Sequence, residues 1–300
     1  MGEDRLTPGP QQPDATPAGP PLSAPGDVDL APLLGRGRLL VALDFDGVVA
    51  PLTDDPAHST PLPATARAIA GLAALPDTTV GFISGRPLGV LKDLTDPPPQ
   101  AVFIGSHGAE EDFGAEAPRA SAGDGTSDDD GAPALTPAER AVLDTLDAAF
   151  ARISAEAPAE GEGELRLERK PLGRTFHVRG TTGARRAFFV ERVDALLADV
   201  PSARRIHGHE VIEYAVRKTT KGQGLARMID RTGARAALYI GDDTTDEDAF
   251  ALLHRVRAEL PGLGVKVGPG ATAADVRIPA PTDVSVLLAR LLESRAPRVA

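Results

Sequence analysis

The feature that most constrains the fold is the apolar run from Leu39 to Leu43, which is bounded by Gly37 and Gly47. A short apolar run without polar interruption is typical of a strand that is buried on both faces of a parallel sheet. The sequence therefore predicts an α/β fold in which this strand lies inside the sheet.

Two aspartates, Asp44 and Asp46, stand where this strand should end. Residues two positions apart in extended backbone point the same way, so both carboxylates should enter one cavity. Two carboxylates at such a short distance repel each other unless a cation or a proton lies between them. Carboxylate oxygens are suitable ligands for Mg²⁺. The alternative interpretation is an Asp-x-Asp-Gly turn that only ends the strand.

Composition narrows the class of protein. A chain of 300 residues predicts two domains, and its 42% hydrophobic content is enough for a packed core. The chain has no cysteine, which excludes disulfides and thiol chemistry, and its net charge of -11 argues against a nucleic-acid partner. We find neither an apolar run long enough for a membrane span nor a signal-peptide layout, so we expect a cytoplasmic protein without a membrane partner.

The order of the predicted elements indicates one α/β core that is interrupted by an inserted domain. Residues 1–35 are rich in proline, alanine and glycine, and we expect a disordered tail there. Strands alternate with helices in residues 36–112 and again in 218–296, which is the rhythm of right-handed βαβ units. The predicted core strands are residues 39–43, 79–83, 101–104, 236–240 and 264–267.

The inserted segment, residues 113–217, breaks this rhythm. It begins with an acidic stretch, 114–133, that we interpret as a solvated loop or linker. Thr136-Pro137-Ala138-Glu139 then has the form of a capping box at the start of a helix. Alternating apolar and polar residues favour an antiparallel sheet with one exposed polar face, and hence an α+β domain. The strands of this sheet are predicted at 164–170, 174–179, 204–207 and 211–216.

Polar residues follow the core strands directly. In open α/β sheets, ligands bind outside the carboxyl ends of the strands, so we expect these residues to surround one crevice. They are Asp44, Asp46, Ser84, His107, Asp242 and Asp243.

Some of these polar positions also have a purely structural interpretation. Ser84-Gly85-Arg86 is compatible with a tight turn that caps a helix. For His107 we favour a positioning role over metal binding. Thr244-Thr245-Asp246-Glu247 has the form of a capping box, so for Asp246 and Asp248 we favour helix capping. The aspartates that precede this box are the favoured metal ligands.

Lys221 is a separate indication of function. It is the first residue of a predicted helix, where a positive charge interacts unfavourably with the helix dipole. A lysine that is kept in such a position hints at a functional role. The alternative is an ordinary exposed lysine.

These motifs resemble those of a known superfamily and of one family within it. Asp44-Phe45-Asp46-Gly47, Ser84, Lys221 and Gly241-Asp242-Asp243, in this order, resemble the haloacid dehalogenase-like phosphohydrolases. Residues 83–86, 105–108, 221–222 and 241–250 look like those of trehalose-6-phosphate phosphatases. The resemblance covers about residues 38–292 and implies a Rossmann-like parallel-sheet core with an inserted α+β cap domain.

The activity implied by this resemblance is the magnesium-dependent release of trehalose from trehalose 6-phosphate. Asp44 would attack phosphorus to form an aspartyl-phosphate, and Asp46 would act as general acid and base. Mg²⁺ would be held by Asp44, the Asp46 carbonyl and Asp242, with Asp243 in support. The phosphoryl group would be bound by Lys221, Ser84 and nearby backbone amides, including that of Gly85.

The resemblance also places the inserted sheet as a lid over the crevice. Glu168, Lys170 and Glu213 correspond to residues with which relatives bind the sugar that carries no phosphate. The alternative is that the polar face of this sheet is only solvated. Further substrate-binding candidates are Arg86, His107, His177 and Arg179.

Other functions stay open at this point. A related enzyme could act on sucrose 6-phosphate or mannosyl-3-phosphoglycerate, and a catalytically silent sugar-phosphate sensor is disfavoured because all four motifs are intact. The expected partner is therefore a small-molecule sugar phosphate. We expect a monomer, and functional coupling to a trehalose-6-phosphate synthase stays open.

Overall fold

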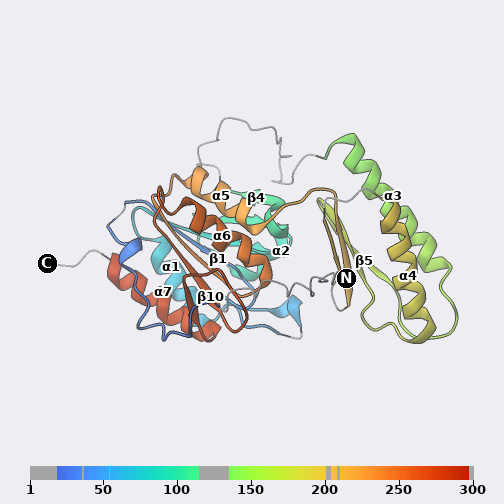
Figure 1. The fold of residues 1–300 in the computed structure, drawn as a ribbon, viewed down its shortest axis with the longest axis horizontal. Coiled ribbons are helices and arrows are strands. Elements are labelled where there is room, and N and C mark those ends of the chain that lie inside the picture. The colour runs from blue at the N-terminus through green and yellow to red at the C-terminus, as the bar shows by residue number, and fades with distance from the viewer. Residues whose placement is uncertain are drawn as a thin grey trace, which may run out of the picture.

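The computed structural model describes residues 19–35, 37–53, 55–114, 135–200, 204–207 and 210–296. These residues form a seven-stranded sheet and a four-stranded sheet, which lie in different parts of an elongated molecule (Figure 1). Apart from Gly114, the predicted acidic loop lies outside the described residues. None of the helices in the described part of the chain combines the length and apolar character that crossing a membrane requires.

The predicted buried strand is β1 (Leu39–Leu43), the middle strand of the larger sheet, and all its residues are buried. It pairs in parallel with β2 (Thr78–Ile83) on one side and with β9 (Ala236–Gly241) on the other. The strand order is β11-β10-β9-β1-β2-β3-β4, and only the β3–β4 pair is antiparallel. The remaining strands are β3 (Val102–Gly105), β4 (Glu110–Asp112), β10 (Gly262–Val267) and β11 (Val276–Ile278). The predicted α/β class is therefore confirmed.

Helices cover both faces of this sheet, as Figure 1 shows. Leu39, Val41 and Leu43 belong to the apolar cluster on one face, whereas Leu40 and Ala42 belong to the cluster on the other. The first cluster includes side chains of α1 (Pro63–Ala73), α2 (Leu88–Thr95) and α7 (Pro281–Arg295). The second includes side chains of α5 (Lys221–Thr232) and α6 (Glu247–Val256).

The smaller sheet is antiparallel, as its alternating sequence predicts, with the strand order β5-β6-β8-β7. Two helices, α3 (Pro137–Ala155) and α4 (Gly183–Asp199), pack on its apolar face, and its other face is turned toward the larger sheet (Figure 1). The strands are β5 (Arg166–Lys170), β6 (Gly173–His177), β7 (Arg204–His207) and β8 (Val211–Ala215). The domain boundaries at residues 113 and 217 remain a prediction.

The N-terminal segment differs from the predicted tail. Val28, Leu30 and Leu33 are buried in the apolar cluster of the larger sheet, and Leu33 lies in the short helix η1 (Ala31–Leu33). Leu22 forms an isolated bridge with Arg277. The expectation of disorder is therefore wrong for residues 19–35, while residues 1–18 lie outside the described part of the chain.

An ion pair ties the first turn of α3 to the segment between β8 and α5. Both guanidinium nitrogens Nε and Nη2 of Arg217 donate to the Glu139 carboxylate, the second over 2.7 Å. Glu139 also completes the predicted capping box with Thr136, which is confirmed. The hydrogen bond from Arg217 is the main reason why the pKa of Glu139 is lowered to about 2.

This ion pair predicts a pH dependence of stability. A carboxyl whose pKa is lower in the folded than in the unfolded state stabilises the fold above its unfolded pKa, about 4.3, and loses that contribution as the pH falls toward 2. We expect Glu139→Gln to be less stable than the wild type at pH 7, by up to about 1 kcal/mol. The difference should shrink between pH 5 and pH 3 in thermal unfolding, and a difference that stays constant would contradict this account.

Candidate active site

A cavity of about 620 Å³ lies where the carboxyl ends of the core strands face the smaller sheet. It brings together residues that are far apart in the sequence, including Glu168 from β5. The predicted site residues among its lining are Asp44, Asp46, Ser84, Gly85, Arg86, His107, Glu168, Lys221, Asp242 and Asp243.

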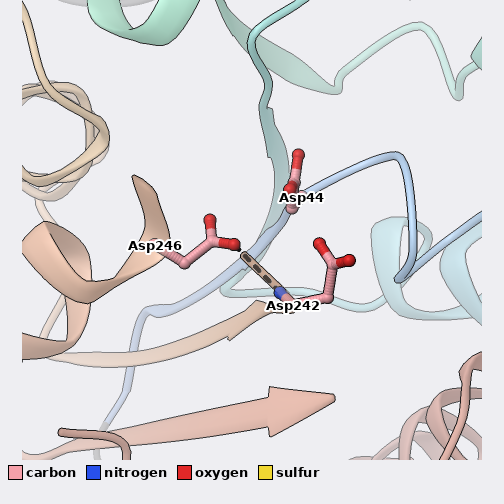
Figure 2. Close-up of side chains that lie close together, drawn as sticks. All are labelled: Asp44, Asp242 and Asp246. Carbon is pink, nitrogen blue, oxygen red and sulfur yellow. Dashed lines mark hydrogen bonds between the residues drawn. The ribbon is translucent and has the colours of Figure 1, made fainter. Parts of the chain in front are cut away.

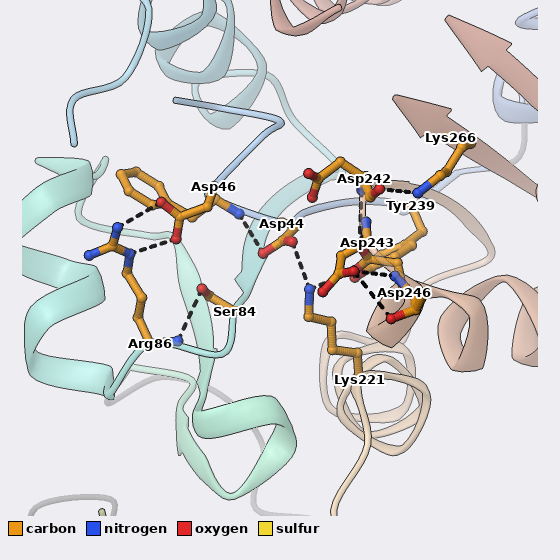
Figure 3. Close-up of polar contacts among 12 residues, drawn as sticks. Asp44, Asp46, Ser84, Arg86, Lys221, Tyr239, Asp242, Asp243, Asp246 and Lys266 are labelled. Carbon is orange, nitrogen blue, oxygen red and sulfur yellow. Dashed lines mark hydrogen bonds and ion pairs between the residues drawn. The ribbon is translucent and has the colours of Figure 1, made fainter. Parts of the chain in front are cut away.

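A buried lysine bridges two buried carboxylates at the base of this cavity. Lys221 Nζ lies 2.6 Å from Asp44 Oδ2 and 2.7 Å from Asp246 Oδ1 (Figure 3). The three residues are at most 4% exposed. The unfavourable position of Lys221 at the start of α5 is thus explained, because two carboxylates surround its ammonium group.

The electrostatic balance of this cluster is negative. The pKa of Asp44 is raised to about 8, because burial and the nearby Asp246 and Asp242 together outweigh the opposing effect of Lys221. The pKa of Lys221 is itself raised, because the attraction of the two carboxylates outweighs the effect of burial. Asp44 Oδ1 accepts a hydrogen bond of 2.7 Å from the backbone N–H of Phe45, which fixes the carboxylate plane.

Asp246 is the functional residue whose importance the sequence analysis missed. Its Oδ2 accepts hydrogen bonds from the backbone N–H groups of Asp242 (2.9 Å) and Asp243 (2.8 Å). Its Oδ1 accepts from Lys221 and from the hydroxyl of Tyr239 (2.6 Å). Asp246 therefore holds both the lysine and the turn that carries Asp242. The sequence places Asp246 in a predicted capping box, and its local pattern carries no signal for the contact with Lys221.

Asp243 and Asp246 together cap the helix that follows β9. Asp243 is exposed and caps the helix η4 (Thr244–Asp246), because its Oδ1 accepts from the N–H of Thr244 over 2.6 Å. The capping box thus joins Asp243 and Asp246, one residue earlier than the predicted pair, Thr244 and Glu247. Asp243 also lines the large cavity, and its expected supporting role at the metal remains a prediction.

The acidic cluster fits a divalent cation. Asp44, Asp242 and Asp246 each offer a carboxylate oxygen, and these atoms lie within 4.8 Å of one another (Figure 2). Each oxygen of Asp246 already accepts two hydrogen bonds, whereas each oxygen of Asp44 accepts one. Asp44 and Asp242 therefore keep lone pairs that could hold an ion. Burial and the neighbouring Asp246 raise the pKa of Asp242 to about 6. A bound Mg²⁺ would offset this crowding of negative charge.

Two local features fix Asp242 in this place. Lys266, buried on β10, donates from Nζ to the main-chain carbonyl of Asp242. Gly47 follows the Asp44–Asp46 motif with φ +73°, and a Cβ atom there would lie 2.0 Å from Asp242 Oδ2. The carboxylate of Asp242 therefore packs against a backbone position that only glycine can occupy.

Asp46 is held by Arg86. The guanidinium donates from Nε to Asp46 Oδ2 (2.6 Å) and from Nη2 to Oδ1 (2.7 Å), and lies over the ring of Phe45 (Figure 3). Ser84 is buried, and its hydroxyl accepts from the backbone N–H of Arg86 over 3.2 Å. Arg86 was expected to bind substrate. In this structure it is paired with Asp46, the residue expected to act as general acid and base.

His107 lies in a strained turn beside Ser84 and Gly85. Ser106 and His107 have φ values of +47° and +55°, which non-glycine residues rarely adopt. The imidazole packs so closely on Gly85 that a Cβ there would lie 2.5 Å from the ring. The turn thereby places the imidazole at the cavity wall.

The predicted lid residues lie on the polar face of the smaller sheet, where they pair with one another. Glu168 Oε2 lies 3.0 Å from His177 Nε2, and Lys170 Nζ lies 3.2 Å from Glu213 Oε2. Lys170 and Glu213 line a small second cavity together with His107 of the core. Arg179 is exposed beyond the end of β6 and does not line either of these two cavities.

The fold is that of haloacid dehalogenase-like hydrolases. A solved haloacid dehalogenase-like hydrolase from Bacteroides thetaiotaomicron superposes with a TM-score of 0.56 at 12% identity, covering 85% of this chain and 99% of the other. The C-terminal domain of a C. albicans trehalose-6-phosphate phosphatase superposes with a TM-score of 0.64 at 20% identity, covering 88% and 96%.

The sequence comparisons identify the particular family. The trehalose-phosphatase family matches residues 42–277, so the chain belongs to this family of phosphoric monoester hydrolases. A probable trehalose-phosphate phosphatase 9 from Oryza sativa subsp. japonica is 26% identical over 290 residues, covering 91% of this chain and 75% of the relative.

The position of Asp246 generates a prediction. Asp246→Asn removes the charge that orients Lys221, although an amide oxygen can still accept from the backbone. We expect hydrolysis of a phosphate monoester to fall about 10- to 100-fold, as for other residues that orient catalytic groups. Initial rates of phosphate release measure the effect, and Asp248→Asn is the matched control because Asp248 is exposed two residues further on. Equal rates for the two variants would contradict a supporting role for Asp246.

Proposed function

We propose that this protein hydrolyses trehalose 6-phosphate to trehalose and phosphate, with Asp44 as the nucleophile and Mg²⁺ as the cofactor. The observation that carries the proposal is the buried Asp44 carboxylate, which opens onto the cavity beside Lys221 and Asp242. Membership in the trehalose-phosphatase family supports the substrate. The names of relatives, such as the trehalose-6-phosphate phosphatase of Escherichia coli, support it as well.

The first step would be attack of an Asp44 oxygen on phosphorus, which gives an aspartyl-phosphate and frees the sugar oxygen. Lys221 and the N–H of Phe45 hold the carboxylate in place for this attack. Lys221 would also stabilise the phosphoryl oxygens as charge develops on them. Ser84 and Gly85 line the same cavity, and we expect the Ser84 hydroxyl and the Gly85 amide to assist in this.

Asp46 would supply the protons for both halves of the reaction. It would protonate the leaving sugar oxygen in the first step and accept a proton from water in the second. Both of its oxygens accept hydrogen bonds from Arg86, so this pair must open before Asp46 can contact the leaving sugar oxygen or the water. We infer that substrate binding draws Arg86 away from Asp46, which would reconcile the observed pair with a substrate-binding role for Arg86.

Mg²⁺ would be held by the carboxylates of Asp44 and Asp242, together with the main-chain carbonyl of Asp46. When bound, it would supply a Lewis acid that screens the phosphate from the surrounding acids. Asp246 and Lys266 hold the Asp242 turn in place for this role. Asp243, through its capping of η4, would support the same turn.

The polar face of the smaller sheet would recognise the sugar that carries no phosphate. Glu168, Lys170 and Glu213 present two carboxylates and an ammonium group on the side of the sheet that faces the core. His177 pairs with Glu168 and would assist in positioning it. Phosphate release from a panel of disaccharide phosphates, including trehalose 6-phosphate and sucrose 6-phosphate, tests the proposed substrate. A preference for sucrose 6-phosphate would overturn it.

The role of Asp44 gives a direct test. Asp44→Asn is expected to reduce phosphate release to less than about 1% of the wild-type rate, because a neutral amide does not attack phosphorus. Circular dichroism and thermal unfolding should show a folded variant. A folded variant with higher residual turnover would exclude Asp44 as the nucleophile.

The metal gives a second test. Excess chelator should stop hydrolysis, and added Mg²⁺ should restore it. Ca²⁺ should restore it poorly, since its larger and looser coordination shell misplaces nucleophile and phosphate. Asp242→Ala should remain inactive in saturating Mg²⁺. Full activity in excess chelator would refute the metal requirement.

A further inference from the structure

The polar face of the smaller sheet contains a buried hydroxyl without a hydrogen-bond partner. Thr175, the middle residue of β6, is 3% exposed, and its Oγ1 neither donates nor accepts a hydrogen bond in this structure. A buried polar atom left in this state destabilises a fold, and such atoms are rare in native structures. The position therefore calls for a reason other than stability.

The strand register places this hydroxyl between two carboxylates. Thr175 lies directly opposite Glu168 of β5 and directly opposite Glu213 of β8. Directly opposite residues in an antiparallel sheet point to the same face. Glu168 lines the large cavity and Glu213 lines the small one, so Thr175 belongs to the face that looks toward the phosphate site.

Two diagonal ion pairs lie on either side of Thr175. Glu168 reaches along the sheet to His177, and Lys170 reaches past Gly173 to Glu213. The Lys170 and Glu213 side chains are 13% and 17% exposed, so this pair is itself largely shielded from solvent beside the buried Thr175. A ligand that takes over the hydrogen bonds of these pairs would separate their members and uncover the threonine.

We propose that the Thr175 hydroxyl is a specificity-determining contact for the sugar ring that carries no phosphate. This inference rests on the proposed function and adds a residue to it. Carboxylates accept from sugar hydroxyls and the ammonium donates to them, whereas a threonine hydroxyl can do both at once. The group suited to this mixture of donors and acceptors is a neutral sugar ring with adjacent hydroxyls.

A pair of substitutions tests the contact. Thr175→Val keeps the shape of the side chain and removes the hydroxyl, while Thr175→Ser keeps the hydroxyl. We expect the valine variant to lose about three- to tenfold in kcat/KM for trehalose 6-phosphate, which is the effect of one neutral hydrogen bond. Hydrolysis of p-nitrophenyl phosphate, which has no second sugar, should be unchanged. The serine variant should retain activity on both.

Thermal unfolding separates this contact from a purely structural role. If the hydroxyl stabilised the fold, its removal would lower the melting temperature. Thr175→Val should raise the melting temperature of the ligand-free protein, because it removes an unsatisfied buried hydroxyl. Thr181→Val is the matched control: Thr181 is also buried in the same part of the chain, but its hydroxyl donates to the Val178 carbonyl over 2.6 Å. The control should lower the melting temperature and leave kcat/KM unchanged.

Three results would overturn the inference. They are an unchanged kcat/KM for trehalose 6-phosphate in Thr175→Val, an equal loss on both phosphates, and a lowered melting temperature like that of the control. Failure of the proposed function is distinguishable, because the wild type would then prefer another disaccharide phosphate or release no phosphate from trehalose 6-phosphate. If the wild type prefers another disaccharide phosphate, the same comparison is made on that substrate, and the same loss would support the contact.

Discussion

The ammonium group of Lys221 between the carboxylates of Asp44 and Asp246 is the interaction on which the rest of the site depends. It joins β1 to the start of α5, across 177 residues of sequence, and to the turn that follows β9. Removing one partner from a buried ion pair typically costs about 3–5 kcal/mol, because the other charge stays buried without compensation. The groups that would perform the chemistry are therefore also groups that hold the core together at this edge of the sheet.

This arrangement determines where a cation or a charged substrate can bind. Lys221 is shared by two acids, and Asp242 adds a third carboxylate to the same space. The oxygens of Asp246 are occupied by donors from Tyr239 and from the backbone, whereas the carboxylate of Asp242 faces the cavity. The protein thus separates its acids into one that supports and two that remain available to a cation. A phosphate dianion can approach such a cluster only when positive charge accompanies it.

The elements that could be predicted from the sequence are those with a local signal. The solid apolar run of β1, the alternation in the smaller sheet and the capping box of α3 each lie within a few residues, and the structure confirms all three. Helix α2 and strands β4 and β11 were not predicted, because each of them is short. In α2 the helical spacing of Leu88, Leu91 and Leu94 extends over only about two turns. Residues 28–33 were interpreted as part of a tail because single leucines and a valine, without periodicity, enter the core one at a time.

Prediction of the candidate site from the sequence was likewise limited to residues with a local signal. The residues after the core strands do meet at one cavity, because parallel strands end at a common edge. The capping box was predicted one residue too late, because its spacing fits at two offsets in this segment. The pairs Arg86–Asp46 and Lys170–Glu213 join segments that are distant in sequence, and no local pattern indicates them. Thr175 looked like one of several polar residues on a solvated face.

The position of β1 between β2 and β9 has a consequence for how the chain assembles. Leu39 pairs with Ala236, so the central parallel pairing must close a loop of about 200 residues, which is entropically costly and slow. The smaller sheet with α3 and α4 is built from contacts within residues 135–216 and lies inside that loop. If these residues collapse first, they form a compact block that shortens the effective distance between the two halves of the core. The insertion would then serve chain closure during folding as well as recognition in the finished protein.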